Sequence, residues 1–449
     1  MEGRAATHGL SGRPGSEPAT RRSAALRRLD QSALRDCWRA LWVSRIVVWV
    51  GGVGGVLALG RPRGWRGFDP ASLTAPFGAF GDVLVAPAAR WDSVWYLSIA
   101  HDGYVEGART VFYPLYPLMV RIVGAPLALL GNGTGARLLA GIAISLAALG
   151  AGLYCVHRLA ELELGRDRAR LVVMLVALFP LAFAFSAVYT ESIFLALSAG
   201  SIYAGRTGRW RLAGVLGALA AATRTTGLLL VVPLALLYAY GPRADRERPA
   251  PRPGRRRWMP AHRLAGDFWW IAVVPAGLIG YLAYLWAATG DPFAPFGQQA
   301  VWYRHFAGPL GGAWDGAVAA VAGVRQLASG SRAHVYFTPA GGDPFAVGAH
   351  NVIDFAFLVF AVVALVGIVR CLPLAYGAWA LVSVVIPLSY PVGPEPLASF
   401  PRYLAVVFPL QMWLAAWAHE RRAARWVLAI STLALVVETA RFASWHWVT

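Results

Sequence analysis

The chain has 449 residues, of which 57% are hydrophobic and 14% are charged, whereas water-soluble domains carry about 25% charged residues. All 41 basic residues are Arg and the formal net charge is +18, but the Arg residues cluster between apolar segments. They are better explained as membrane-topology signals than as a nucleic-acid surface, so nucleic acid is not an expected partner. The three isolated Cys and the nine His show no metal-ligand spacing, so we expect neither a metal nor another cofactor.

Apolar segments recur along the whole chain, and several approach the ~20 residues that a membrane-crossing helix needs. Helices satisfy their own backbone hydrogen bonds in lipid, so the pattern predicts an all-α polytopic membrane protein. We expect about 11 crossings, within a range of 9–12, at residues 41–59, 135–157, 171–187, 192–205, 211–222, 227–240, 268–288, 352–369, 373–390, 403–418 and 426–444.

The Arg-rich segments predict the orientation, with the N-terminus and the other positive segments in the cytoplasm. Residues 1–38 are polar and basic and are expected to form a disordered cytoplasmic tail, followed by a single transmembrane domain over 39–449. That domain has three long connections. They are an external loop at 60–134 that carries interfacial helices, a cytoplasmic linker at 241–266 and an external loop at 290–350.

The first external loop contains the stretch RWDSVWYLSIAHDGY at residues 90–104. Read as a helix, it places Trp91 and Trp95 on one face and Asp92 and Tyr96 on another, as in a helix that lies in the membrane interface. Asp92 would then lie at the mouth of the membrane, where a carboxylate can accept a proton from a hydroxyl group. The alternative is an interfacial helix whose Asp is merely exposed.

Further along the same loop, FYPLYPL at residues 112–118 has two prolines three residues apart, after Tyr113. They interrupt helical hydrogen bonding and predict either a cavity wall or a bent structural helix.

Two polar breaks follow between apolar segments. One contains Tyr189 and Glu191, and the other contains Arg224. Ionisable groups at membrane depth are costly and tend to be paired or functional. The predicted topology places both breaks outside, where Glu191 and Arg224 form either a purely structural pair or one that holds a substrate phosphate.

The segment SFPRY at residues 399–403 begins the tenth expected crossing. With Pro401 at the start of a helix, the neighbouring amides and Arg402 can bind an anion. The alternative is an Arg402 side chain that only extends to the interface.

Five stretches resemble one family: RWDSVWYLSIAHDGY, VFYPLYPL, FSAVYTESIFLALS, RWRLAG…TRTTGLLLVVP and SFPRYLAVVFPL. In this order they are similar to the PIG-V mannosyltransferases, which include the enzyme that adds the second mannose in GPI-anchor synthesis, and to their bacterial relatives. The Arg-only composition suggests a bacterial member. The resemblance covers most of residues 90–240 and 399–410.

The resemblance implies a glycosyltransferase of the GT-C superfamily and fold, with its active site at the outer face of the plasma membrane. The implied reaction is inverting transfer of mannose from polyprenyl-phosphate-mannose to an acceptor that the sequence does not identify. The expected partners are therefore this lipid-linked donor, membrane lipids and the acceptor. Asp92, with Trp91, would be catalytic, either as the general base or as the group that positions the acceptor. The expected donor-phosphate and substrate-binding residues are Arg402, Arg224, Glu191, Tyr189, Tyr96, Tyr113 and Tyr403.

Three other functions stay open. One is a non-catalytic membrane scaffold, which would not need Asp92. A GT-C transferase could use another lipid-linked sugar. A flippase or transporter of lipid-linked sugars often shows internal repeats, and the polar motifs here differ from one another.

Overall fold

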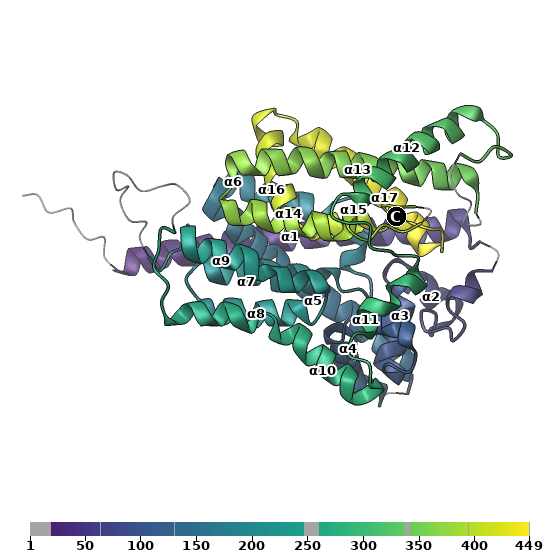
Figure 1. Cartoon of the computed structure of the whole chain (residues 1–449), viewed down its shortest axis with the longest axis horizontal. Helices are drawn as coiled ribbons and strands as arrows, with labels where there is room; N and C mark the ends of the chain where they lie inside the picture. The colour runs from purple at the N-terminus through teal and green to yellow at the C-terminus, as the bar shows by residue number, and fades with distance from the viewer. Residues whose placement is uncertain are drawn as a thin grey trace, which may run out of the picture.

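The computed structural model describes residues 19–62, 64–129, 131–246, 260–336, 342–393 and 395–448. This part of the chain is all-helical, and its only β-type pairing is an isolated bridge between Arg304 and Val392. Most of the longer helices run along the long axis of the molecule (Figure 1).

Four helices in the described ranges are long and apolar enough to cross a membrane. They are α1 (Ala19–Leu59), α5 (Gly133–Leu164), α13 (Pro344–Cys371) and α17 (Ala424–Ala443). The 3₁₀ helix η6 (Gly266–Val273) and α10 (Ala276–Thr289) meet at 40° and together provide a fifth candidate.

The remaining helices are shorter. Those in the body are α6 (Arg166–Ala177), α7 (Glu191–Arg206), α8 (Trp210–Ala221), α9 (Val231–Tyr240), α14 (Leu374–Leu388), α15 (Phe400–Ala405) and α16 (Phe408–Glu420). Those in the long connections are α2 (Gly78–Val85), α3 (Asp92–Asp102), α4 (Leu115–Ala128), α11 (Ala294–Gly297) and α12 (Gly311–Ser329). Short 3₁₀ turns complete the set: η1 (Trp65–Phe68), η2 (Ala86–Ala88), η3 (Gly107–Val111), η4 (Ala182–Phe185), η5 (Thr225–Leu230) and η7 (Gln298–Trp302).

Each of the eleven expected crossings coincides with a helix or with two consecutive helical elements. The number of crossings stays a prediction, because only four or five of these elements meet the length and composition of a span.

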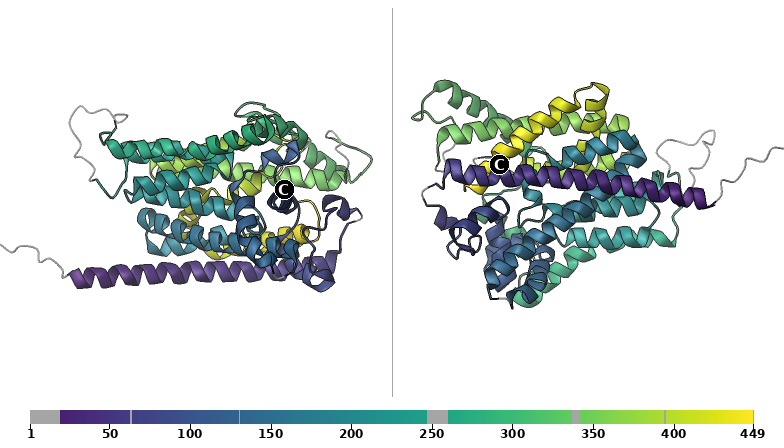
Figure 2. Two further views of the ribbon diagram at one scale, coloured as in Figure 1. Left: turned by 90° about the horizontal axis from the view of Figure 1, so that it is seen from below. Right: turned by 180° about the vertical axis from the view of Figure 1, so that it is seen from behind.

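The connections form two groups at opposite ends of the body. The N-terminal end of α1 and the links α5–α6, α7–α8 and α16–α17 lie at the left of Figure 1, whereas α2, α3, α4, α11 and the C-terminus lie at the right. Figure 2 shows the same separation, with α1 along one side of the bundle. These are the two groups that the charge distribution assigns to opposite sides of the membrane.

The N-terminal tail differs from its prediction. Residues 19–38 are helical as part of α1, whereas residues 1–18 lie outside the described residues. The segment is rich in Ala, Arg and Leu, which favour helix. Ala33, Cys37 and Ala40 are buried at helical spacing, so the helix packs on the body well before the apolar run begins. The buried face is a narrow stripe of small residues among many charged ones, so the composition of the segment does not indicate an amphipathic helix.

The other two long connections also differ from a simple loop or linker. One contains a helix, and part of the other lies outside the described residues. The external loop at 290–350 contains α12, which packs against α13, and it includes the first residues of α13. Of the linker at 241–266, residues 247–259 lie outside the described residues.

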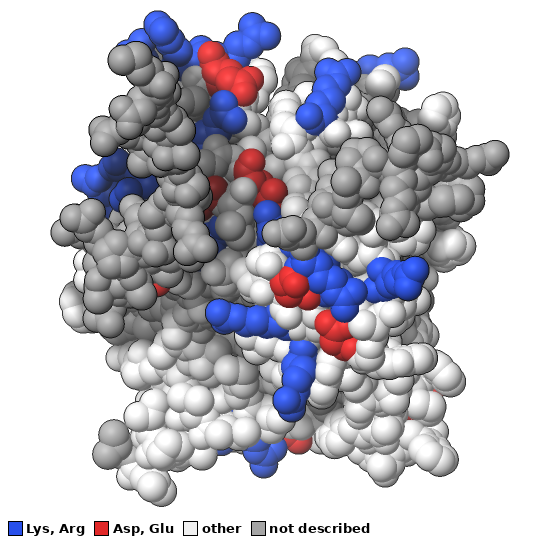
Figure 3. Space-filling view, turned by 90° about the vertical axis from the view of Figure 1, so that its left-hand side faces the viewer, with Lys and Arg blue, Asp and Glu red and all other residues white. Residues whose placement is uncertain are grey.

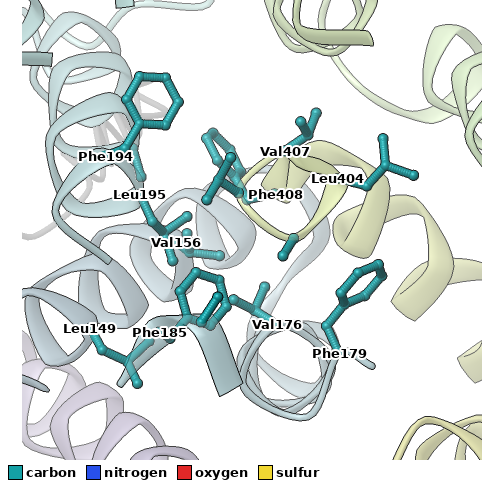
Figure 4. Packing of buried hydrophobic residues seen from close by; sticks show 14 of the residues in the cluster. Leu149, Val156, Val176, Phe179, Phe185, Phe194, Leu195, Leu404, Val407 and Phe408 are labelled. Carbon is teal, nitrogen blue, oxygen red and sulfur yellow. The ribbon is translucent and has the colours of Figure 1, made fainter. Parts of the chain in front are cut away.

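The main apolar core lies where α5, α6 and α7 meet the α15–α16 turn (Figure 4). Leu149 and Val156 of α5 face Phe185 and Leu195, and Phe408 closes the cluster from the other side. Phe194 belongs to the same core and supports Arg224, whose guanidinium carbon lies 5.7 Å from the ring centroid. The core therefore contacts a charged residue, Arg224, through Phe194.

The contact between α1 and α17 depends on small residues. A Cβ atom added at Gly55 would lie 2.4 Å from the Cα of Ala440, and one at Gly51 would lie 3.4 Å from the Cα of Val436. Glycines four residues apart on one face allow two helix backbones to approach closely.

Candidate active site

The start of α3 presents Asp92 to the interior of the protein. Trp91 caps the helix with φ 52° and ψ −116°, a left-handed conformation that is strained for a side chain of this size. Just before it, Arg90 is buried, and its Nε donates a hydrogen bond to the carbonyl oxygen of Ala443 at 3.0 Å. This bond ties the start of α3 to the last residue of α17.

Asp92 pairs with Arg402 of α15, 310 positions away in the sequence. Nη1 of Arg402 donates to Oδ2 of Asp92 at 2.7 Å, and the backbone N–H of Asp92 donates to the Tyr189 hydroxyl at 3.2 Å. The other carboxylate oxygen, Oδ1, has no hydrogen-bond partner among the described residues, and the side chain is 29% exposed. One oxygen of Asp92 is thus held, and the other is open to a ligand.

Glu191 lies between two arginines. It is the first residue of α7, where a negative charge interacts favourably with the helix dipole, and only 1% of its side chain is exposed. Nη2 of Arg224 donates to its Oε1 at 2.5 Å, and Nε of Arg402 lies 3.5 Å from the same oxygen. The predicted Glu191–Arg224 pair is present, and Arg402 extends it into a chain of charges that ends at Asp92.

A third guanidinium, which the sequence did not indicate, faces the same group. All three guanidinium groups lie near the Tyr403 ring. The distance from the ring centroid to the guanidinium carbon is 5.2 Å for Arg224, 5.7 Å for Arg402 and 5.9 Å for Arg304. Nη2 of Arg304 also donates to the Tyr403 hydroxyl at 3.2 Å. Arg304 follows η7. Its backbone N–H donates to the carbonyl oxygen of Gln299 at 3.2 Å, and its Nη1 donates to the carbonyl oxygen of Tyr390 at 3.2 Å.

Three guanidinium groups and two carboxylates leave this cluster with one net positive charge. Arg304 has no carboxylate partner among the described residues, and the buried Nε of Arg402 has no hydrogen-bond partner there. A buried polar group without a partner requires an explanation, and an anion at this point would supply one. The cluster is therefore suited to a phosphate, since guanidinium groups bind phosphate oxygens with directed hydrogen bonds.

The predicted tyrosines are placed unequally. Tyr96 adjoins the cluster because its hydroxyl lies 3.3 Å from Oγ1 of Thr190, and the guanidinium of Arg402 lies over the Tyr189 ring at 5.0 Å. Tyr113 is one step further out. Its hydroxyl meets Thr225 at 2.8 Å, and its ring packs on Tyr281.

The ring of Trp91, the residue next to Asp92 in the sequence, packs in a group of aromatic residues. It contacts Phe68, Trp445 and Trp447 with centroid distances of 4.8, 5.6 and 5.2 Å. This aromatic group forms a wall beside Asp92, built from the first long loop and the C-terminal segment.

The two prolines of FYPLYPL do not break a helix. Pro114 caps α4 and Pro117 lies in its first turn, where a missing N–H costs nothing. Pro401 lies at the start of α15 as predicted.

Asp102 lies at the far end of α3 and outside the cluster. Its side chain is 44% exposed, and hydrogen bonds from His101 and then Arg109 lower the pKa of its carboxyl group. No group of three or more potential metal ligands occurs within the described ranges.

Comparison with known protein families decides which class of protein carries this site. Residues 77–237 match the model of the mannosyltransferase (PIG-V) family. The resemblance predicted from the sequence is thereby confirmed over these residues, and the matched family is one of glycosyltransferases. The matched region includes Asp92, Glu191 and Arg224, whereas Arg304 and Arg402 lie beyond it.

Among solved structures, the chain is similar to an oligosaccharyltransferase of Archaeoglobus fulgidus. With the form tethered to an acceptor peptide it shares 12% identity and a TM-score of 0.41, over 90% of this chain and 55% of that one. With the form that holds an inhibitory peptide and a dolichol-phosphate, the identity is 12% and the TM-score 0.40, over 90% of this chain and 55% of that one. With the form that holds Zn and sulfate, the identity is 12% and the TM-score 0.36, over 74% of this chain and 44% of that one.

The chain thus spans about half of the length of these structures. Similarity at this level carries no argument about function. A comparison with curated proteins finds no match.

Proposed function

We propose that this PIG-V-type enzyme transfers mannose from polyprenyl-phosphate-mannose to an acceptor hydroxyl, with inversion, at the outer face of the plasma membrane and on a GT-C-type fold. The observation that carries the proposal is the Asp92–Arg402 pair within a buried cluster of one net positive charge. A carboxylate and a phosphate-binding cation side by side are what transfer from a lipid phosphate to a hydroxyl requires.

The donor phosphate would bind on the cationic side of the cluster. A phosphodiester carries one negative charge, which matches the net charge of the five groups. Arg304 has no carboxylate partner among the described residues, and Nε of Arg402, although it lies 3.5 Å from Oε1 of Glu191, makes no hydrogen bond there. Arg224 is held by Glu191 and Thr190 and would add charge with fewer free donors.

The acceptor would approach Asp92 at its free oxygen. The acceptor oxygen attacks the anomeric carbon and forms the new glycosidic bond while the bond from that carbon to the phosphate oxygen breaks. The hydroxyl proton passes to Oδ1 of Asp92, and the lipid phosphate leaves with the electron pair. Guanidinium groups stabilise the charge that develops on the phosphate, and attack opposite to the leaving group inverts the anomeric centre.

The location at the outer face rests on the charge distribution. The site lies at the end of the body that carries α3 and the C-terminus, opposite the Arg-containing links that the topology prediction assigns to the cytoplasm (Figure 1). The choice of mannose rests on the family description. Another lipid-linked sugar, such as glucose or arabinose, would use the same phosphate contacts.

The test is transfer from radiolabelled polyprenyl-phosphate-mannose to a membrane extract by the purified protein in lipid. We expect Asp92→Asn to lower transfer about 10²–10⁴-fold, the contribution of a general base. Asp102→Asn is a matched control, because it makes the same change at the other end of α3, in an exposed side chain.

Three results are informative. Loss of transfer in Asp92→Asn but not in Asp102→Asn supports the proposal. If both variants transfer the sugar as fast as the wild type, Asp92 has no role in the mechanism. Absence of transfer by the wild type, with transfer from another lipid-linked sugar, would overturn the choice of mannose.

A further inference from the structure

A second charged site lies at the opposite end of the molecule from Asp92. A cavity of about 760 Å³ opens there between α1 and the start of α6. It is lined by Ser32, Arg35, Asp36, Arg39, Arg166, Asp167 and Arg170. Arg side chains are prominent on this end of the surface (Figure 3).

The described residues that line the cavity carry an excess of positive charge. Asp36 is already engaged, because its carboxylate lies 3.4 Å from Nε2 of His157 and 3.8 Å from Nε of Arg170. Arg39 and Arg166 have no carboxylate partner among the described residues. The lining therefore has four guanidinium groups and two carboxylates, and one of these carboxylates, Asp36, is shared between His157 and Arg170.

The start of α6 adds to this field. α6 begins at Arg166, after Gly165 in a left-handed conformation, and the first backbone N–H groups of a helix lack intrahelical acceptors. Free N–H groups and the positive end of the helix dipole favour an anion beside Arg166. The arginines and the helix end thus favour the same kind of ligand.

Two tryptophans on α1 indicate the level of the cavity relative to the lipid headgroups. Trp38 is 65% exposed and Trp42 is 48% exposed, and their rings meet edge to face at 5.4 Å. Exposed Trp residues next to an apolar helix gather at the level of lipid headgroups. Arg35 and Arg39 flank Trp38 on α1, so the cavity opens at that level.

We propose that this cavity binds the phosphate of an anionic phospholipid headgroup. Basic pockets between helices at the membrane surface bind such headgroups. A topology signal alone requires only positive charge outside the bilayer, and it accounts neither for a cavity nor for a helix N-terminus among the arginines. A lipid rather than a free phosphate is favoured because the flanking tryptophans place the opening where headgroups are concentrated.

The test uses the full-length protein in neutral detergent, with bound lipid counted by native mass spectrometry. Phosphatidylglycerol is titrated against the wild type, the double variant Arg39→Gln/Arg166→Gln and the control Arg421→Gln, whose exposed Arg lies in the α16–α17 link. An Arg near a membrane surface contributes about fivefold in affinity, so we expect the double variant to bind about 30-fold more weakly and the control to bind unchanged.

Phosphatidylcholine and inorganic phosphate are the competing probes. Weaker binding of phosphatidylcholine, and no displacement of phosphatidylglycerol by millimolar inorganic phosphate, would support a lipid site. Equal binding in the double variant and the wild type would overturn the proposal, and so would displacement by inorganic phosphate alone. The thermal unfolding midpoint of each variant checks that it is folded, and neither substitution touches the residues assigned to transfer.

Discussion

Arg304 differs from the other two arginines of the cluster in having no carboxylate beside it. Asp92 pairs with Arg402 and Glu191 pairs with Arg224, so both of these guanidinium groups are partly neutralised before any ligand arrives. Among the described residues, the Arg304 side chain donates hydrogen bonds to a hydroxyl and a backbone carbonyl and lies against the Tyr403 ring, and it has no carboxylate partner. Its charge is therefore the one most available to a donor phosphate.

We expect Arg304→Gln to raise the KM for the lipid-linked donor about 10- to 100-fold, since a hydrogen bond to a charged group contributes about 1.5–3 kcal/mol. The KM for the acceptor should change little. Initial rates at varied donor concentration measure the effect.

The matched control is Arg325→Gln, an exposed Arg on α12. A change in kcat with donor KM unaltered would show that Arg304 does not hold the donor in the ground state.

Glu191 has a structural part that can be separated from catalysis. It is buried and serves two arginines, so Glu191→Gln leaves two cations without their shared partner. Breaking a buried ion pair costs about 3–5 kcal/mol, and we expect a clearly lower thermal unfolding midpoint.

The double variant Glu191→Gln/Arg224→Gln should recover part of this loss, because it also removes one of the unpaired cations. The same measurement on the two single variants and the double variant completes the cycle. If the two effects simply add, the pair is not energetically coupled.

The sequence indicated most of the cluster because its residues contrast with their surroundings. Glu191, Arg224 and Arg402 interrupt apolar segments, and Asp92 lies in an aromatic stretch. Arg304 gave no such contrast, since it lies in a long loop among other polar and aromatic residues. Its only signal was the run WYRHF, and chain folding over almost 100 residues brings it to Tyr403.

At the scale of elements, the contact between α1 and α17 can be tested with two neighbouring glycines of α1, one at the contact and one away from it. A Cβ atom at Gly55 would collide with the backbone of Ala440, whereas a Cβ atom at Gly54 meets nothing within 4 Å. Both residues lie in α1, so the effect of replacing Gly on helix propensity is the same at both.

We expect Gly55→Leu to destabilise the protein by about 1–3 kcal/mol, the usual effect of overpacking, and Gly54→Leu to leave the stability unchanged or higher. Thermal unfolding of the two variants in the same detergent measures the difference. Equal midpoints would mean that α1 does not pack on α17 as described.

The apolar runs predicted the helices well because hydrophobicity and helix coincide in lipid. Two helices escaped this signal. Between residues 30 and 40, α1 buries only small residues among many charges. The helix α12 is rich in Gly and Ala, with a Trp, an Asp and an Arg among them. Both depend on packing against a neighbouring helix, which composition does not reveal.

At the scale of the whole molecule, the two groups of connections predict which residues can be reached from each side of the membrane. With the three native Cys replaced by Ala, Glu106→Cys introduces a thiol between α3 and η3, and Arg421→Cys introduces one in the α16–α17 link. The helix α3 and the α16–α17 link lie at opposite ends of the body (Figure 1). In intact cells an impermeant thiol reagent should label residue 106. It should label residue 421 only after the membrane is opened.

The reverse pattern would place the candidate active site in the cytoplasm and overturn the proposed location. Labelling of both residues in intact cells would contradict the separation of the connections into two sides.

The charge of the cluster has a consequence for the order of events after transfer. If the proposed reaction holds, the site with one positive charge and a singly charged phosphodiester are together neutral. The product phosphate monoester carries about −1.5 to −2, and it is balanced only while Asp92 keeps the proton it has taken. When that proton escapes to water, the complex becomes negative and expels the lipid phosphate. Deprotonation of one carboxylate would thus act as the release signal that readies the enzyme for its next turnover.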